Sequence, residues 1–195
     1  NAASSVLSME GSSNQSMVIG SEFPGDVEIN NTGVSPSNTI TLTGDTIIGG
    51  DLILNSGQID VPSGVNLTVK GDLIINSGAT VDVSGGGTIT MGDVSRISVN
   101  SGGTLELVGS GQLATITSTS TTDAYDIVVD GTISAQNYLI QRLDTGGMIV
   151  NSGATIDTTN HFQNGTFSYP VYNSTTMLTL ALEIPGDTIE QITFN

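Results

Sequence analysis

An eight-residue segment of the chain occurs twice, and this repetition restricts the folds that the chain can adopt. The sequence of residues 50–57 (GDLILNSG) recurs almost unchanged as residues 71–78 (GDLIINSG). A period of about 20 residues, carried by short apolar runs and Gly/Asn turns, is typical of a solenoid. The sequence therefore predicts coils stacked on one another, each burying its apolar side chains against its neighbours.

The corner of this repeat can be followed through most of the chain. It recurs at unequal intervals, the longest of which ends at Asp130: Asn31, Asn55, Asn76, Asn100, Asp130 and Asn151. Glycine adopts positive φ and Asn tolerates it, so Asn-Ser-Gly indicates a sharp corner between two strands. The polar run 118–123 accounts for the longest interval as an inserted loop. The coils are thus expected to be irregular, of about 21–30 residues each, within the range of known solenoid repeats.

The residues after the corner alternate between apolar and polar. The pattern Asn-Ser-Gly-(Ala/Gly)-Thr-apolar-acid occurs at 76–82, 100–106 and 151–157. Because successive strand residues point to opposite faces, one set should point inward (Val81, Val83, Leu105 and Leu107) and the other outward (Thr80, Asp82, Thr104 and Glu106). A charge at an inward position should unfold neighbouring coils, and we expect Ile74, Val81 and Leu105 to be such positions.

These patterns predict an all-β chain, a right-handed parallel β-helix, as one domain over residues 1–195. We expect an N-terminal edge or cap segment (1–24), regular coils (25–160) and aromatic-containing final coils (161–195). The hydrophobic fraction is 36%, with four Phe, four Tyr and no Trp. This composition suits a narrow core of stacked Val, Ile and Leu.

The charge balance excludes several classes of partner. The chain has 19 acidic and three basic residues, a net charge of −16. Phosphate backbones are held by Lys and Arg, so nucleic acid and anionic membrane surfaces are improbable partners. No apolar run approaches the length of about 18 residues that a spanning helix needs, so no membrane insertion is expected. Divalent cations and neutral glycans remain possible.

The residues 51–57 (DLILNSG), 76–83 (NSGATVDV) and 164–167 (NGTF) resemble secreted bacterial right-handed parallel β-helix repeat proteins of the surface and adhesin type. The resemblance implies an extracellular or cell-surface protein, which the small-residue start at 1–5 also fits. The fold is shared with pectate-lyase-like enzymes that use Asp clusters with Arg or Lys bases. This chain offers no matching constellation, so we expect it not to be an enzyme.

Three aspartates form the first candidate site. Asp51, Asp72 and Asp93 each follow a glycine and are equally spaced along the chain, so they should stack as a ladder at one corner. Stacked carboxylates repel one another, by about 1 kcal/mol in water. Either they cap backbone N–H groups, the favoured reading, or a cation such as Ca²⁺ neutralises them.

Other polar groups have weaker claims to a function. Asp82 and Glu106 form an outward carboxylate pair that a glycosidase could use, although a solvated face explains them better. His161 has no partner ligand at metal spacing. Thr-x-Thr runs at 39–43, 88–90 and 115–117 resemble the faces of ice-binding solenoids. They do not recur coil by coil in the sequence, so β-propensity accounts for them.

The two ends of the predicted stack suggest the function. Uncovered solenoid ends present unpaired strand edges, which pair with further strands. We therefore expect head-to-tail self-association into a homopolymer, a filament or surface layer, through residues near both ends (Met17, Val18, Ile19, Ile189, Ile192 and Phe194). A glycan-binding adhesin module that uses Tyr169 and Tyr172 is the alternative. A polysaccharide-degrading β-helix enzyme ranks third.

Overall fold

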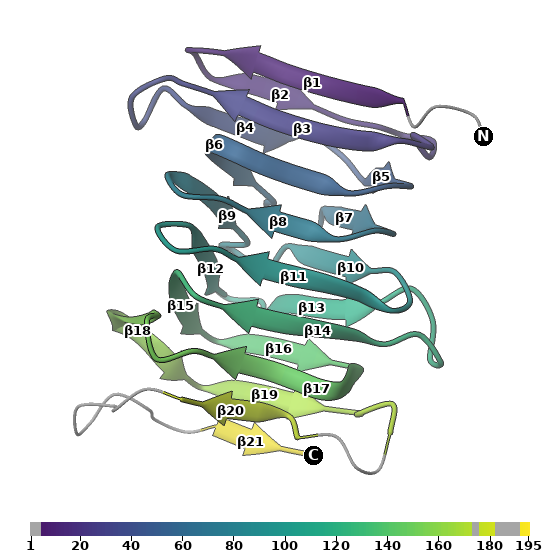
Figure 1. The fold of residues 1–195 in the computed structure, drawn as a ribbon, viewed down its shortest axis with the longest axis vertical. Helices are drawn as coiled ribbons and strands as arrows, with labels where there is room; N and C mark the ends of the chain where they lie inside the picture. Colours follow the sequence, from purple (N-terminus) through teal and green to yellow (C-terminus); the bar gives the residue numbers. More distant parts are fainter. Residues whose placement is uncertain (1–4, 173–175, 182–191) are drawn as a thin grey trace.

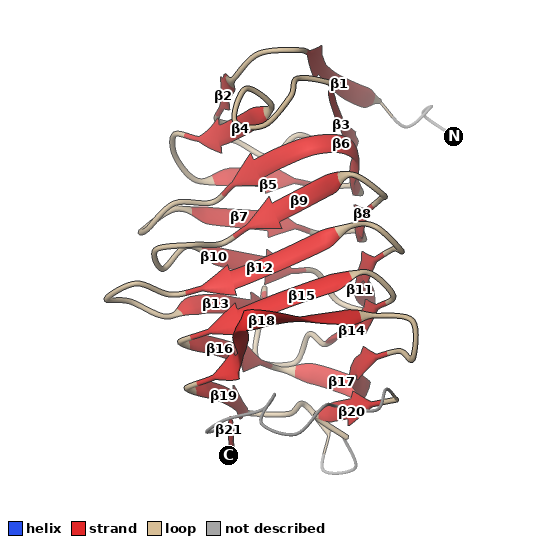
Figure 2. Cartoon of the chain, turned by 90° about the vertical axis from the view of Figure 1, so that its left-hand side faces the viewer, coloured by secondary structure: helices blue, strands red, loops and turns tan. Residues whose placement is uncertain are grey.

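The computed structural model describes residues 5–172, 176–181 and 192–195. These residues form 21 strands and no helix. Parallel strands stack into a β-solenoid of about seven turns (Figure 1), as Figure 2 shows from a second side. The prediction of an all-β parallel solenoid is confirmed.

The coils present three strand faces, which we name A, B and C. Face A contains β1 (Val6–Gly11), β3 (Asp26–Asn31), the first half of β6 (Leu52–Asp60), β8 (Leu73–Ile75), β11 (Ser95–Val99), β14 (Tyr125–Val129), β17 (Leu143–Val150) and β20 (Leu178–Leu180). Face B contains β2 (Gln15–Met17), β4 (Thr39–Leu42), the second half of β6, β9 (Ala79–Asp82), β12 (Thr104–Val108), β15 (Thr132–Gln136) and β18 (Thr155–Gln163). Face C contains β5 (Thr46–Ile48), β7 (Asn66–Val69), β10 (Thr88–Met91), β13 (Ala114–Ser118), β16 (Tyr138–Gln141), β19 (Gly165–Ser168) and β21 (Ile192–Phe194).

The coils differ in length, as the corner spacing predicts. One column of stacked residues on face A shows this, since its members follow one another at unequal steps: Leu52, Leu73, Ile97, Ile127, Met148 and Leu178. The long step that ends at Ile127 contains the loop between β13 and β14, where the polar run was expected to be inserted. Many of the extra residues therefore lie in loops, while the pairings of β3 with β6, β14 with β17 and β15 with β18 contain register shifts within the strands.

One continuous core of mostly aliphatic side chains, contributed by all three faces, fills the interior. Val81, Val83, Leu105 and Leu107 are completely buried, as predicted, while the Thr and acidic residues between them are partly exposed. The prediction for Ile74 is wrong. Its neighbours Leu73 and Ile75 are buried and Ile74 itself faces outward, because a short apolar strand places only alternate residues inside.

Glycine and asparagine have different roles at the corners between strands. Gly57, Gly78 and Gly102 have φ of 89°, 80° and 82°, the conformation that glycine adopts without strain. The asparagines form a side-chain ladder: Asn76 donates to Asn55 at 3.0 Å, and Asn100 donates to Asn76 at 2.8 Å. The ladder thus ties consecutive coils together on the outside of the core.

Asn31 does not belong to this ladder, contrary to the spacing. A register shift after Ile29 sets Asn30 opposite Ser56. Asn31 is instead buried, and its amide donates to the Ser13 carbonyl at 2.8 Å. The shift places the extra residue of β6 at the bend where this strand passes from face A to face B.

Aromatic side chains replace aliphatic ones in the last coils. Tyr138 lies edge-on to Phe162 and Phe167, with ring centroids 5.9 and 5.8 Å apart, and Phe167 stacks on Phe194 at 5.5 Å. Tyr138, Phe162 and Phe167 are fully buried. Packing in the interior, rather than ligand binding, accounts for these three rings.

Candidate functional site

Aspartates at the start of face A form a ladder of hydrogen bonds. Asp26, Asp51 and Asp72 stack in register, one in each coil. Oδ1 of Asp26 accepts from the Asp51 N–H at 3.0 Å, and Oδ1 of Asp51 accepts from the Asp72 N–H at 2.8 Å. Each carboxylate thus satisfies a backbone donor of the next coil, which is the capping role favoured from the sequence. Sequence spacing missed Asp26 because Asp51 follows it after 25 positions rather than 21.

Asp93 is not the next rung, and the prediction that it stacks on Asp72 is wrong. Arg96 occupies that place, and its N–H donates to Oδ1 of Asp72 at 2.8 Å. Arg96 follows Asp72 after 24 positions rather than 21, so the expected rung falls in the loop before β11. Asp93 accepts instead from the Ala124 N–H at 3.2 Å. Within the described part of the chain, no three His, Cys, Asp or Glu side chains group as metal ligands.

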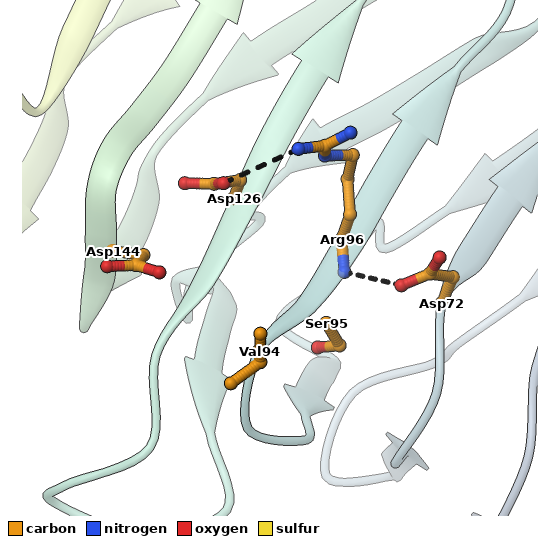
Figure 3. Close-up of a pocket in the computed structure, with 6 residues that line it drawn as sticks. All are labelled: Asp72, Val94, Ser95, Arg96, Asp126 and Asp144. Carbon is orange, nitrogen blue, oxygen red and sulfur yellow. Dashed lines mark hydrogen bonds and ion pairs between the residues drawn. The ribbon is translucent and has the colours of Figure 1, made fainter.

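A polar depression of about 270 Å³ lies where Arg96 interrupts the aspartate ladder. Its lining residues are Asp72, Val94, Ser95, Arg96, Asp126 and Asp144 (Figure 3). The Arg96 guanidinium forms an ion pair with Asp126 at 3.7 Å, and Asp144 lies on the far side of Asp126. A signal for this pair was present in the sequence, because Asp126 follows Arg96 by the same interval as Asp130 follows Asn100.

The electrostatics of this depression are those of a structural ion pair. Burial raises the pKa of Asp126, the neighbouring Asp144 raises it further, and Arg96 opposes both effects. Half of the Arg96 side chain remains exposed, so its charge is screened by water. The arrangement can hold a small polar or ionic group at the surface.

Face B carries a column of carboxylates with no cation in its strands. Asp60, Asp82 and Glu106 stand in register on β6, β9 and β12. Burial and the charge of Asp82 raise the pKa of Asp60, and hydrogen bonding by Thr41 lowers it; burial, Asp82 and Asp157 raise the pKa of Glu106. Adjacent strands place such groups about 4.8 Å apart, close to the spacing of a retaining glycosidase pair. However, Asp82 and Glu106 lie on an open strand face and line neither of the depressions described here.

The raised pKa values of these carboxyls determine whether the protein becomes more or less stable as pH rises. A carboxyl whose pKa is raised by folding binds more protons in the folded state, so the free energy of unfolding falls as pH rises through the folded pKa. We expect Glu106→Gln to raise the melting temperature at pH 8, because it removes the repulsion with Asp82 and Asp157. The gain should disappear toward pH 4.

Thermal melts between pH 4 and pH 8 measure this effect. Glu10→Gln on β1, which also removes one charge but lies far from the column, is the matched control. A gain for Glu106→Gln that is the same at both ends of the pH range would contradict a role for Glu106 ionisation.

A second depression, of about 320 Å³, lies between faces B and C. It is lined by Gly111, Gln112, Leu113 and Asn137. Asn137 turns the chain there with a φ of 52°. No titratable or nucleophilic side chain lines it, so its lining suits packing or a neutral contact.

The candidate residues from β18 onward lie at or near the surface. Tyr169 and Tyr172 are 66% and 49% exposed and follow β19 in one loop. Glycan binding by this loop stays a prediction. His161 contacts the Thr158 carbonyl at 3.1 Å and Gln163 at 3.0 Å, which places it in a local network at the bulge of β18.

The residues expected to mediate self-association divide between core and surface. Met17 is buried and Ile19 is partly buried against the core, while Val18 is 56% exposed. At the opposite end Ile192 is partly buried and Phe194 is 55% exposed. Ile189 lies outside the described residues. The side chains available for contact are thus Val18 and Phe194, with Val6 as a third that the sequence did not single out.

Comparisons with known proteins add no relative to this geometry. No family model matches the chain, and neither the curated proteins nor the solved structures include a significant match. In the described residues, no helix is long and apolar enough to span a membrane. The surfaces of the solenoid itself are therefore the basis for a function.

Proposed function

We propose that this chain is a non-enzymatic structural protein that associates end to end through its outermost coils. The observation that supports the proposal is the pairing of face A. Among the described residues, β1 pairs only with β3, and β20 pairs only with β17 (Figure 1). As far as the described residues go, each end of face A thus presents a strand with one unpaired edge.

The hydrogen-bonding groups of β1 show which atoms this edge offers. The carbonyls of Ser5 and Gly11 accept from β3, at the Asp26 and Thr32 N–H groups. Because backbone groups alternate in direction along a strand, the N–H and C=O of Val6, Ser8 and Glu10 point away from β3. They are the groups that a further parallel strand would bond.

The β20 strand offers the complementary edge. The Met177 carbonyl accepts from Met148, and the Ala181 N–H donates to Val150, so the backbone groups of Leu178 and Leu180 point away from β17. The side chains of Leu178 and Leu180 continue the inward columns of Met148 and Val150 and remain partly buried. At the other end, Leu7 and Met9 continue the columns of Val27 and Ile29.

Joining β20 of one copy to β1 of the next would continue both the hydrogen-bond ladder and the aliphatic column. A head-to-tail contact of this kind does not close, so it propagates into a filament. The net charge of −16 opposes contact between the acidic sides of two copies. An extracellular or surface location is part of the proposal, supported by the polar surface with little Lys.

Proline at the open edge tests this proposal. Ser8→Pro removes one outward N–H and no bond to β3, so it should abolish concentration-dependent growth while leaving the melting temperature nearly unchanged. Ser8→Ala keeps the N–H and is the matched control. Light scattering over a range of concentrations, with electron microscopy of the particles, provides the measurement. A wild-type chain that stays monomeric at high concentration would overturn the proposal.

A further inference from the structure

Face C differs from the rest of this acidic molecule in its chemistry. Its seven strands contain no Asp, Glu, Lys or Arg, although the chain has a net charge of −16. The strands of face A carry six charged residues (Glu10, Asp26, Glu28, Arg96, Asp126 and Asp144), and those of face B carry four acids (Asp60, Asp82, Glu106 and Asp157). The strands of face C are therefore uncharged, with Asp45 just before β5 and Lys70 just after β7 at their ends.

Threonines of face C stack in register over two or three neighbouring coils, although, as expected from the sequence, they do not recur in every coil. Thr88 lies between Asn66 and Thr115, and Thr90 lies between Thr68 and Thr117, in unshifted register. Further down, Thr166 pairs with Leu139 and with Thr193. The stacking is hidden in the sequence because the loops between these strands differ in length.

The outward groups of face C form a two-dimensional lattice. Neighbouring strands are about 4.8 Å apart, and alternate residues on one strand are about 6.6 Å apart. Hydrogen bonds hold several groups in place: Thr90 donates to Asn66 at 2.8 Å, and Gln141 donates to Ser168 at 3.2 Å. Threonine is also stiff at χ1, so its hydroxyl and methyl groups keep fixed positions.

This surface does not suit the usual classes of partner. Tyr138 and Phe167 on its strands are buried, and Phe194, stacked on Phe167 at the last strand, is the one exposed ring in the described part of face C. A single ring at one end of the face provides no row of rings for stacking on a sugar chain. The strand area is on the order of 400 Å², estimated from the strand dimensions. A stable protein dimer buries about 800 Å² on each partner, so a second copy is a poor fit.

A rigid, regularly spaced array of uncharged hydroxyl and methyl groups suits a partner whose own binding groups are regularly spaced, such as a crystal surface. Ice is uncharged, and its water molecules donate and accept hydrogen bonds as threonine hydroxyls do. Charged side chains would hold their own hydration shells and prevent this match, and face C has none in its strands. We propose that face C binds ice, through the threonines of β10 and β13 (Thr88, Thr90, Thr115 and Thr117).

Freezing experiments with two matched variants test this inference. Thr90→Lys puts a charge in the middle of face C, while Thr80→Lys makes the same change on face B, where Thr80 also points outward. The measurements are the gap between melting and freezing points, and the uptake of labelled protein into a growing ice crystal. Melting curves establish that each variant is folded, and Thr117→Lys replaces Thr90→Lys if the latter does not fold.

We expect the wild type and Thr80→Lys to produce a freezing gap and to enter ice, and Thr90→Lys to lose both. A wild type that is excluded from ice and produces no gap would overturn the inference. Equal activity in the two lysine variants would also overturn it, because another surface would then be responsible. Binding to crystalline cellulose or chitin without any effect on ice would assign face C to a neutral glycan instead.

Discussion

Ile75→Asp is expected to unfold several coils of the solenoid at once. Ile75 is completely buried between Leu54 above it and Val99 below it on face A. The substitution loses about 1.5–3 kcal/mol of apolar burial and leaves a carboxylate in a column without a polar partner. The total cost should exceed about 5 kcal/mol. Because each coil is stabilised by its neighbours, the loss spreads along the stack.

Ile74→Asp is the matched control for this result. Ile74 is the adjacent residue, carries the same side chain and faces outward on the same strand. Its replacement should change the free energy of unfolding by about 0.5 kcal/mol, as for other surface substitutions. Circular dichroism melts of both variants provide the measurement. Equal melting temperatures for the two variants would show that the inward and outward assignment of β8 is wrong.

Gly92→Ala is expected to have the second largest effect, through the spacing between coils. A Cβ at Gly92 would lie 2.1 Å from the carbonyl oxygen of Lys70 and 2.7 Å from its carbonyl carbon. These are backbone atoms of the preceding coil, so they cannot turn aside as a side chain would. The clash should cost about 1–3 kcal/mol or more. For a chain of this size, each kcal/mol lowers the melting temperature by roughly 2–4 °C.

The control for Gly92→Ala is Gly153→Ala. No atom lies within 4 Å of a Cβ built at Gly153, and its φ is not in the positive range. Alanine there should leave the melting temperature unchanged or slightly raised. If both variants melt alike, the coils can separate locally to admit a methyl group, and close backbone packing is not what selects glycine at position 92.

Much of the fold could be predicted because the repeat reflects the conformational preferences of adjacent residues. The Asn-Ser-Gly corners and the alternation after them correctly placed Val81 and Leu105 inside and Thr80 and Glu106 outside. The errors have separate causes. Equal spacing in the sequence does not give stacking in space where loop length varies, so Arg96 rather than Asp93 lies beside Asp72. A register shift within the strand pair removes Asn31 from the Asn ladder, and strand alternation turns Ile74 outward.

The candidate surfaces were harder to predict than the core. The Arg96–Asp126 pair and the carboxylate column each join residues from neighbouring coils, and only the register between strands shows which residues meet. Met17 illustrates a second difficulty. An apolar residue near the end of a solenoid can face either the core or the open edge, and here it faces the core.

The sequence by itself determined the class of fold, the sharp corners and the inward column, since each depends on the conformational preferences of a few adjacent residues. Only the tertiary structure decided which side chains share a face, because that depends on the lengths of loops that the repeat does not fix. The contrast between the acidic strands of face B and the uncharged strands of face C arises at this level. Residues such as Thr90 and Thr117, which lie in different coils and far apart in the chain, become neighbours through strand register.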